Sequence, residues 1–169
     1  MPTTMTVQKT VHVREIGRPT RFAFVLGTSC VVLGGLVAAV TEPLAVADGS
    51  WLAAYLVLVG GVAQCAITGM PLWLAARPIS TRLNWTELAC WNLGNALVII
   101  GVLTDLPWFV DFGGVALLIG LGIAWHAARR GTKPGRATRF TGPAYRCLLL
   151  LLLISIPIGA ALAHSRALT

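Results

Sequence analysis

The chain has 169 residues, which suits one domain of ordinary size, but its composition excludes an ordinary water-soluble domain. Hydrophobic residues make up 56% of it and charged residues only 11%, whereas a typical soluble domain has about a quarter of its residues charged. The formal net charge of +7 would suit a nucleic acid, but the basic loops offer no stacking platform beyond Phe140, so we expect no nucleic-acid partner. The sequence instead predicts an all-α polytopic membrane protein, with residues 1–169 forming a single transmembrane domain.

The chain begins with a polar tail over residues 1–21 and continues with an uncharged run of nineteen residues over 22–40. Such a run is long enough to cross the hydrocarbon core as a helix. Cleavage as a signal peptide stays open as an alternative, because Ala45-Val-Ala47 has the small-x-small form of a cleavage site. The run is longer than the 7–15 residues of a signal's apolar region, which favours a retained first span.

The second and third spans are predicted over residues 51–75 and 85–104. Trp51 and Tyr55 near one end of the second span, and Trp73 near the other, match the aromatic belts of membrane interfaces. Pro71 is expected to kink or end this helix. The connection before it, residues 41–50, holds two acids and no basic residue.

The fourth span is predicted over residues 108–127 and the fifth over 145–163. The connection Asp105-Leu-Pro107 is so short that the third and fourth helices must be antiparallel neighbours. Between the last two spans, residues 128–146 hold six basic residues, no acid, and several Gly and Pro that favour an irregular loop.

The charges sort by side when five spans are assumed. The N-terminal tail, the 76–86 loop and the 128–146 loop hold twelve of the thirteen Lys and Arg, whereas the 41–50 and 105–107 connections hold none. The positive-inside rule then predicts a cytoplasmic N-terminus and an outer C-terminus. Together with the Arg-, Ala- and Gly-rich composition, this indicates the inner membrane of a bacterium.

Polar side chains fall near the midpoint of four predicted spans. With a rise of about 1.5 Å per residue, the predicted depths place five polar residues in one layer: Ser29, Gln64, Asn92, Asn95 and Ser155. Hydrogen bonds between such groups fix the order and register of helices in lipid. A solute or proton path through the bundle is the competing interpretation.

Glycine pairs and charged residues supply further expectations. Gly34-Gly35, Gly60-Gly61 and Gly113-Gly114 are expected to let helices approach closely. Glu87 and Asp111 are expected to be first-turn acids that favour the positive end of the helix dipole. The basic loop fixes topology and is also a candidate contact for anionic lipid, through five residues: Arg129, Arg130, Lys133, Arg136 and Arg139.

No catalytic, cofactor or metal motif is recognised. The four cysteines lack ligand spacing and are expected to act as small apolar residues. A haem needs two axial ligands at similar depth, and the predicted topology puts His126 and His164 on opposite sides. We therefore expect no cofactor bound by this chain alone.

The sequence favours a non-enzymatic protein, either an accessory subunit of a larger membrane complex or a self-associating bundle, whose partners are lipid and other membrane subunits or further copies of the chain. Two alternatives stay open. One is a small-solute transporter or channel that uses the polar layer, with Pro71 and Pro157 marking bent helices. The other is a redox subunit that contacts haem or quinone together with a partner.

Overall fold

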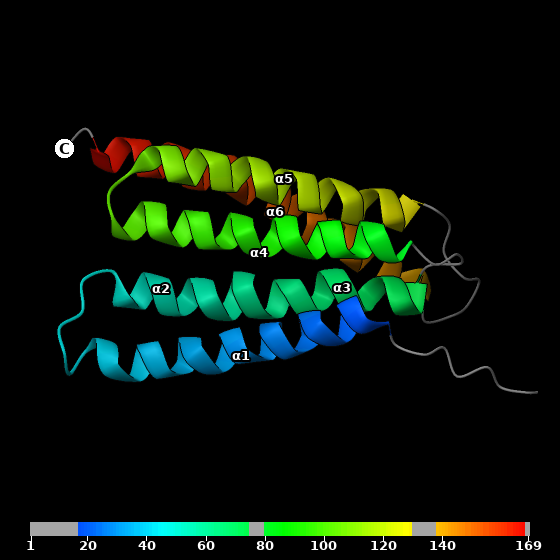
Figure 1. Cartoon of the computed structure of the whole chain (residues 1–169), viewed down its shortest axis with the longest axis horizontal. Coiled ribbons are helices and arrows are strands. Elements are labelled where there is room, and N and C mark those ends of the chain that lie inside the picture. Colours follow the sequence, from blue (N-terminus) through cyan, green and yellow to red (C-terminus); the bar gives the residue numbers. More distant parts are fainter. Residues whose placement is uncertain (1–16, 75–79, 130–137, 168–169) are drawn as a thin grey trace, which may run out of the picture.

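The computed structural model describes residues 17–74, 80–129 and 138–167, and all the regular structure in them is helical. Five helical stretches are long and apolar enough to cross a membrane, which confirms the predicted all-α architecture with five long apolar helices. Figure 1 shows them side by side: α1 (Arg18–Thr41); the second span made of α2 (Gly49–Tyr55), the π-helical η1 (Leu56–Ala63) and α3 (Gln64–Leu74); α4 (Thr81–Leu103); α5 (Pro107–Arg129); and α6 (Thr138–Ala167).

All five spans begin before their predicted first residues, and the shift is at least four residues in α1, α4 and α6. α4 starts at Thr81, where the hydroxyl of Ser80 accepts a hydrogen bond from the Leu83 N–H at 3.3 Å. α6 starts at Thr138, so the second half of the predicted 128–146 loop is helical and includes Pro143. Pro143 is the sixth residue of α6 and therefore lies inside the helix, where its lack of an N–H removes one hydrogen bond of the helix. Pro71 does not end the second span either, since α3 continues to Leu74.

The two ends of the bundle carry opposite charge. Arg18, Arg82 and Arg129 lie at the end where α1 and α4 begin and α5 ends, which we call the basic end. Glu42 and Asp105 lie at the other, acidic end, which also holds the described end of α6 (Figure 1). The segregation of charge predicted from the sequence is therefore present in space.

Glycines set how closely α1 approaches the second span. A Cβ atom added to Gly27 would lie 2.7 Å from the Cys65 Sγ and 3.2 Å from the Gly61 carbonyl oxygen. At Gly34 an added Cβ would lie 2.9 Å from the Ala53 carbonyl oxygen. The distance at the Ala53 oxygen is shorter than real Cβ contacts and that at the Gly61 oxygen is tighter than most of them. The backbones of α1 and the second span are therefore in close contact, which suits association in lipid.

The α4–α5 pair is packed in the same way. The two helices are joined by the tight turn at Asp105 and lie antiparallel, as predicted. Gly94 and Gly113 face each other, and a Cβ atom on either would lie 2.8 Å from the carbonyl oxygen of the other. The sequence predicted a role in close packing for Gly113, as part of the Gly113-Gly114 pair. It made no such prediction for Gly94, which faces Gly113 across the interface.

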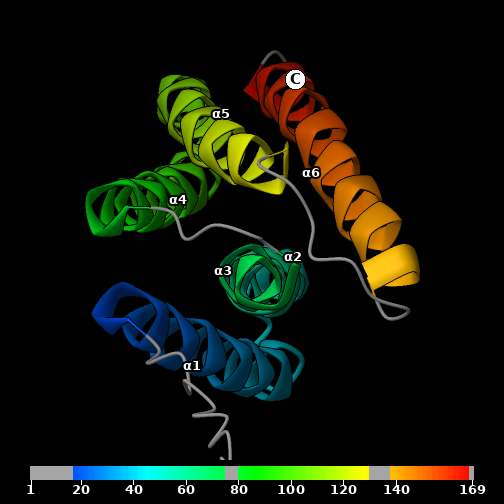
Figure 2. The ribbon, with the colours of Figure 1, turned by 90° about the vertical axis from the view of Figure 1, so that its right-hand side faces the viewer.

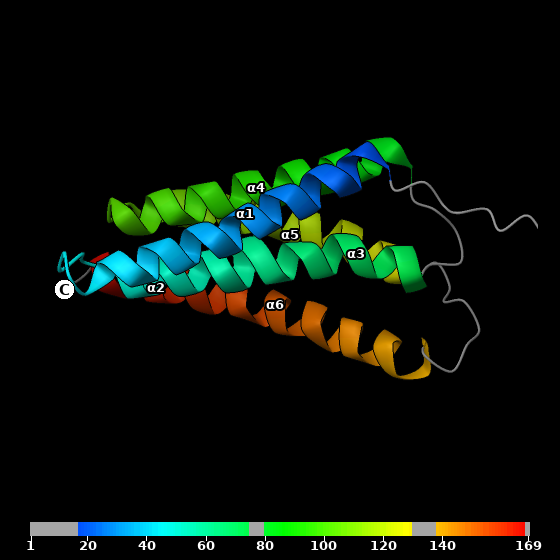
Figure 3. The same ribbon diagram turned by 90° about the horizontal axis from the view of Figure 1, so that it is seen from below.

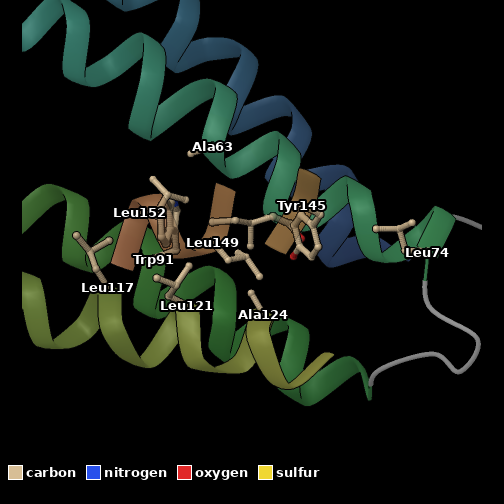
Figure 4. Close-up of a cluster of buried hydrophobic side chains, with 10 residues drawn as sticks. Ala63, Leu74, Trp91, Leu117, Leu121, Ala124, Tyr145, Leu149 and Leu152 are labelled. Carbon is tan, nitrogen blue, oxygen red and sulfur yellow. The ribbon is translucent and has the colours of Figure 1, made fainter. Parts of the chain in front are cut away.

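α6 joins the bundle differently. Figures 2 and 3 show it running obliquely to the second span, whose helices are seen end-on in Figure 2. It packs against α3 and α5 through Tyr145, Leu149 and Leu152, which meet the central apolar cluster drawn in Figure 4. Near the acidic end, His164 Nε2 lies 3.4 Å from the Asp111 carboxylate of α5, and both side chains are half exposed.

Candidate functional site

A cavity of about 320 Å³ lies between the second span, α4, α5 and α6. Its deep wall is formed by Trp91, Leu117 and Leu152, near the middle of the bundle. Its rim is formed by Trp51 and Asp105 at the acidic end. The cavity therefore extends from the central apolar cluster towards the acidic end, over the half of the bundle where α6 runs obliquely.

Small residues leave the space that the cavity occupies. Gly114 of α5 is buried and lines it, and a Cβ atom there would meet only Ile156 Cγ2, at 3.4 Å. Gly159 of α6 also lines it, and a Cβ atom there would have no neighbour within 4 Å. These glycines face side chains or open space, whereas Gly94 and Gly113 face backbone, so the same residue type builds a cavity in one place and a tight interface in another.

The walls are mostly apolar and carry three aromatic side chains. The rings of Trp51 and Tyr55 stack, with centroids 5.1 Å apart and planes inclined by 29°. Trp91 lies deeper and is only 3% exposed. Pockets with apolar, aromatic walls and a few placed polar groups are typical binding sites for small organic molecules.

One polar contact beside the cavity joins two spans. The Tyr55 hydroxyl donates to Asn95 Oδ1 at 2.8 Å, and Asn95 Nδ2 donates to the Trp91 carbonyl oxygen at 2.8 Å. Asn95 belonged to the predicted polar layer, but Tyr55 was read only as an interfacial aromatic residue. Counting the rise of about 1.5 Å per residue from the acidic ends of α2 and α4 puts the two at similar depth, but the predicted bounds 51–75 and 85–104 put Tyr55 nearer the end of its span than Asn95.

The indole N–H of Trp91 has no hydrogen-bond partner in the described part of the chain. An indole nitrogen can only donate, so it needs an acceptor. Leaving a buried donor unpaired costs about 1–3 kcal/mol. Gln64 Oε1 is the other buried side-chain atom without a partner among the described residues, but Gln64 does not line this cavity.

The other members of the predicted layer do not form one network. Gln64 is buried and its Nε2 donates to the Ala23 carbonyl oxygen of α1 at 2.9 Å, so it joins two spans. Asn92, Ser29 and Ser155 instead donate to carbonyl oxygens of their own helices, at 2.8–2.9 Å. The structure therefore brings Asn95 to Tyr55 and Gln64 to α1, and does not bring the five residues together.

Glu87 lies deeper than the first-turn position expected for it. α4 begins at Thr81, no acid stands in its first turn, and Glu87 is only 7% exposed. It lies within electrostatic range of Tyr145 on α6, whose hydroxyl donates to the Ile67 carbonyl oxygen at 3.3 Å. Among the described residues Glu87 forms no ion pair.

The candidate anionic-lipid contacts are described only in part. Arg129 is exposed at the end of α5, and its guanidinium carbon lies 5.4 Å from the centroid of the Trp125 ring. Arg130, Lys133 and Arg136 lie outside the described residues, as does the side chain of Arg139.

The described residues show no group of three His, Cys, Asp or Glu side chains that could hold a metal ion. His126 lies in the last turn of α5 at the basic end, and His164 lies near the acidic end of α6, so they cannot bind one iron from both sides. The cavity, in contrast, can hold an uncharged organic molecule.

Comparisons with protein-family models, curated proteins and solved structures give no match to this chain. The proposals below are therefore argued from the geometry of the cavity and the bundle.

Proposed function

We propose that this protein is a non-catalytic, multi-pass membrane protein that binds a small, largely apolar molecule in the cavity between the second span, α4, α5 and α6. The observation that carries the proposal is a mostly apolar cavity lined by three aromatic side chains, Trp51, Tyr55 and Trp91. Its volume of about 320 Å³ is at the small end of ligand pockets, which span about 300–1,000 Å³.

We further propose that the basic end faces the cytoplasm of a bacterium and the acidic end faces outwards across the inner membrane. This orientation follows from the positive-inside rule applied to the basic residues around the ends of α1, α4 and α5. The cavity then lies in the outer half of the membrane. Contact of the basic end with anionic lipid belongs to the same proposal.

Binding is favoured over solute transport by the directions of the polar side chains. A path through the bundle needs polar groups that follow one another across the membrane. Ser29 and Ser155 instead bond to their own helices, and Asn95 is engaged by Tyr55. Of these contacts only the Tyr55–Asn95 bond joins two spans, and the apolar cavity lies beside it.

Association with another membrane subunit or a second copy is the second candidate function. A shallow groove between α1 and α2 favours it, because small residues such as Gly35, Ala38 and Ala54 line that groove. Small residues let a further helix approach closely in lipid. Native mass spectrometry after extraction in mild detergent tests this role, and a lone monomer at all concentrations would contradict it.

Ligand binding is tested by extracting what co-purifies with the protein. We expect mass spectrometry of the organic extract to show a small molecule with the wild type that is lost from Gly114→Leu, because leucine at this position fills the cavity. Gly122→Leu on the same helix is the matched control, since a Cβ atom at Gly122 has no neighbour within 4 Å and Gly122 does not line the cavity. Identical extracts from all three proteins would overturn the proposal.

A further inference from the structure

We infer that the apolar ligand is a membrane lipid, that it places one acyl chain lengthwise in the cavity, and that the chain enters sideways between α2 and α6. The inference rests on the proposed binding function and adds the chemical class of the ligand, its direction in the site and its route of entry. It follows from the shape of the cavity and from which of its sides the helices close.

The cavity is long and narrow. Its wall on α6 extends from Leu152 to Ala163 and its wall on α4 from Trp91 to Val102, in each case eleven residues or about 17 Å of helix. Over a length of about 17 Å, the volume of about 320 Å³ gives a mean cross-section of about 20 Å². Aliphatic carbons in contact stand about 4 Å apart, so this cross-section holds one hydrocarbon chain and no second chain beside it.

The dimensions match an acyl chain and exclude a helix of another protein. A helix about 10 Å in diameter and of the same length would need about four times the volume of the cavity. The hydrocarbon core of a bilayer is about 30 Å thick and is filled from both sides, so each acyl chain extends over about 15 Å. The cavity covers a similar distance along the helices, from the middle of the bundle to the acidic end.

Contacts between neighbouring helices close three sides of the cavity. α4 and α5 approach backbone to backbone at Gly94 and Gly113. The hydrogen bond between Tyr55 and Asn95 joins the second span to α4. α5 packs against α6. A chain therefore has no route into the cavity through these three interfaces.

The fourth side, between α2 and α6, is open. α6 packs against the second span at α3, near the basic end, and among the described residues it has no comparable packing with α2 or η1. Figure 2 shows the red end of α6 standing away from α2. On this part of α6, Gly159 and Leu162 line the cavity and are exposed, Leu162 at 60%. In a membrane this side meets acyl chains, so a chain can enter without passing through water.

The charges around the cavity set the direction of the lipid. The deep wall at Trp91, Leu117 and Leu152 has no charged side chain, so the methyl end of the chain lies there. Asp105 is exposed at the rim, where its carboxylate repels the carboxylate of a free fatty acid. A phospholipid has an uncharged ester at this end of its chain, and its head group stays in water. The site therefore favours a phospholipid.

Photolabelling tests the class of ligand. The full chain is reconstituted in vesicles of phosphatidylethanolamine and phosphatidylglycerol with a little phosphatidylcholine that carries a diazirine at the methyl end of one chain. Parallel vesicles contain a trifluoromethyl phenyl diazirine, which is a compact aromatic probe. After irradiation, mass spectrometry locates the labels. We expect the phosphatidylcholine to label Leu117 and Leu152 in the deep wall, which are only 4% and 7% exposed and are shielded from bulk lipid.

Variants and an internal control identify the route of the label. Labels on Val115 and Ile119, which are 56% and 51% exposed on α5, report contact with bulk lipid. Gly114→Leu fills the cavity and should lose only the labels in the deep wall, whereas Gly122→Leu on the same helix should keep them. Gly159→Leu should also lower them, because leucine there narrows the open side and its Cβ atom has no neighbour within 4 Å.

The outcomes separate the inference from the proposed function. If the phenyl diazirine labels the deep wall and the phosphatidylcholine labels only Val115 and Ile119, the inference is wrong and the proposed function stands. The inference is also wrong if Gly114→Leu keeps the phosphatidylcholine labels in the deep wall. If neither probe labels the deep wall while both label Val115 and Ile119, the proposed function itself is wrong.

Discussion

The α4–α5 interface and the α5–α6 interface share one helix and yet are packed in opposite ways. On one side of α5, Gly113 meets Gly94 so closely that no Cβ atom fits between the backbones. On the other side, Gly114 faces Ile156 at an ordinary distance and lines a cavity. Adjacent glycines therefore serve close packing on one face and open space on the next, and the comparison can be tested with substitutions of matched size.

The largest effect is expected at the tight interface. In Gly94→Ala the new methyl group meets the Gly113 carbonyl oxygen at 2.8 Å, and backbone cannot move aside as a flexible side chain does. We expect a loss of about 1–3 kcal/mol in the free energy of unfolding, the usual cost of overpacking. Unfolding by a denaturing detergent measures it, with Gly122→Ala as the control because a Cβ atom there meets nothing within 4 Å. Equal stabilities of the two variants would show that α4 and α5 are not in backbone contact.

The next effect concerns the hydrogen bond between the second span and α4. Tyr55→Phe leaves Asn95 Oδ1 without its donor, and we expect a loss of about 1 kcal/mol in stability. The double variant Tyr55→Phe/Asn95→Leu should lose less than the sum of the single variants, because both remove the same bond. Asn92→Leu serves as the comparison, since the Asn92 amide donates only to its own helix. Strict additivity would argue that the Tyr55–Asn95 contact contributes nothing.

A smaller change in stability is expected at the cavity. Gly114→Ala places one methyl group 3.4 Å from Ile156 Cγ2 and should change the free energy of unfolding by no more than about 0.5 kcal/mol, as for sites free of steric conflict. The same unfolding assay is applied to Gly94→Ala. The difference in the free energy of unfolding between the two variants shows how much more tightly α5 is packed on the face towards α4 than on the face towards α6. A loss at Gly114 as large as that at Gly94 would mean that the cavity collapses in the folded protein.

The smallest effect is expected where α6 meets α5 near the acidic end. His164 and Asp111 are half exposed and 3.4 Å apart, and exposed pairs contribute about 0–1 kcal/mol. His164→Ala should therefore lower the midpoint of thermal unfolding only slightly, and high salt should reduce the difference further. A large loss would indicate that this contact, rather than the central apolar cluster, holds α6 in place.

Much of the architecture could be predicted from local properties of the chain. Hydropathy over long windows predicted the five spans, because every backbone polar group in lipid must bond within its own helix. The short connection at Asp105 predicted the antiparallel α4–α5 pair. Helix starts were predicted less well, since hydropathy does not detect the cap at Ser80, and α6 continues through Pro143 although proline usually interrupts a helix.

The candidate site was largely beyond the reach of the sequence. Depth along each span predicted that Asn95 and Gln64 would seek partners in other helices, and each does, but depth does not show which side of a helix faces its neighbour. Ser29 and Ser155 stand at the expected depth and still bond to their own helices. The unpaired N–H of Trp91 could not be predicted from the sequence, because it depends on which side chains surround the indole ring in the folded bundle.

The sequence by itself determined the number of spans, the connections between them and the segregation of charge to the two ends. These properties depend on the free energy of transferring each segment from water to lipid. That free energy is a sum of contributions from residues that are neighbours in the sequence. The tertiary structure alone decided that α6 runs obliquely, that Gly113 meets a backbone while Gly114 meets a cavity, and that Glu87 is buried. Those outcomes depend on how helices rotate and cross in lipid, where close packing and single hydrogen bonds, rather than hydrophobicity, select the arrangement.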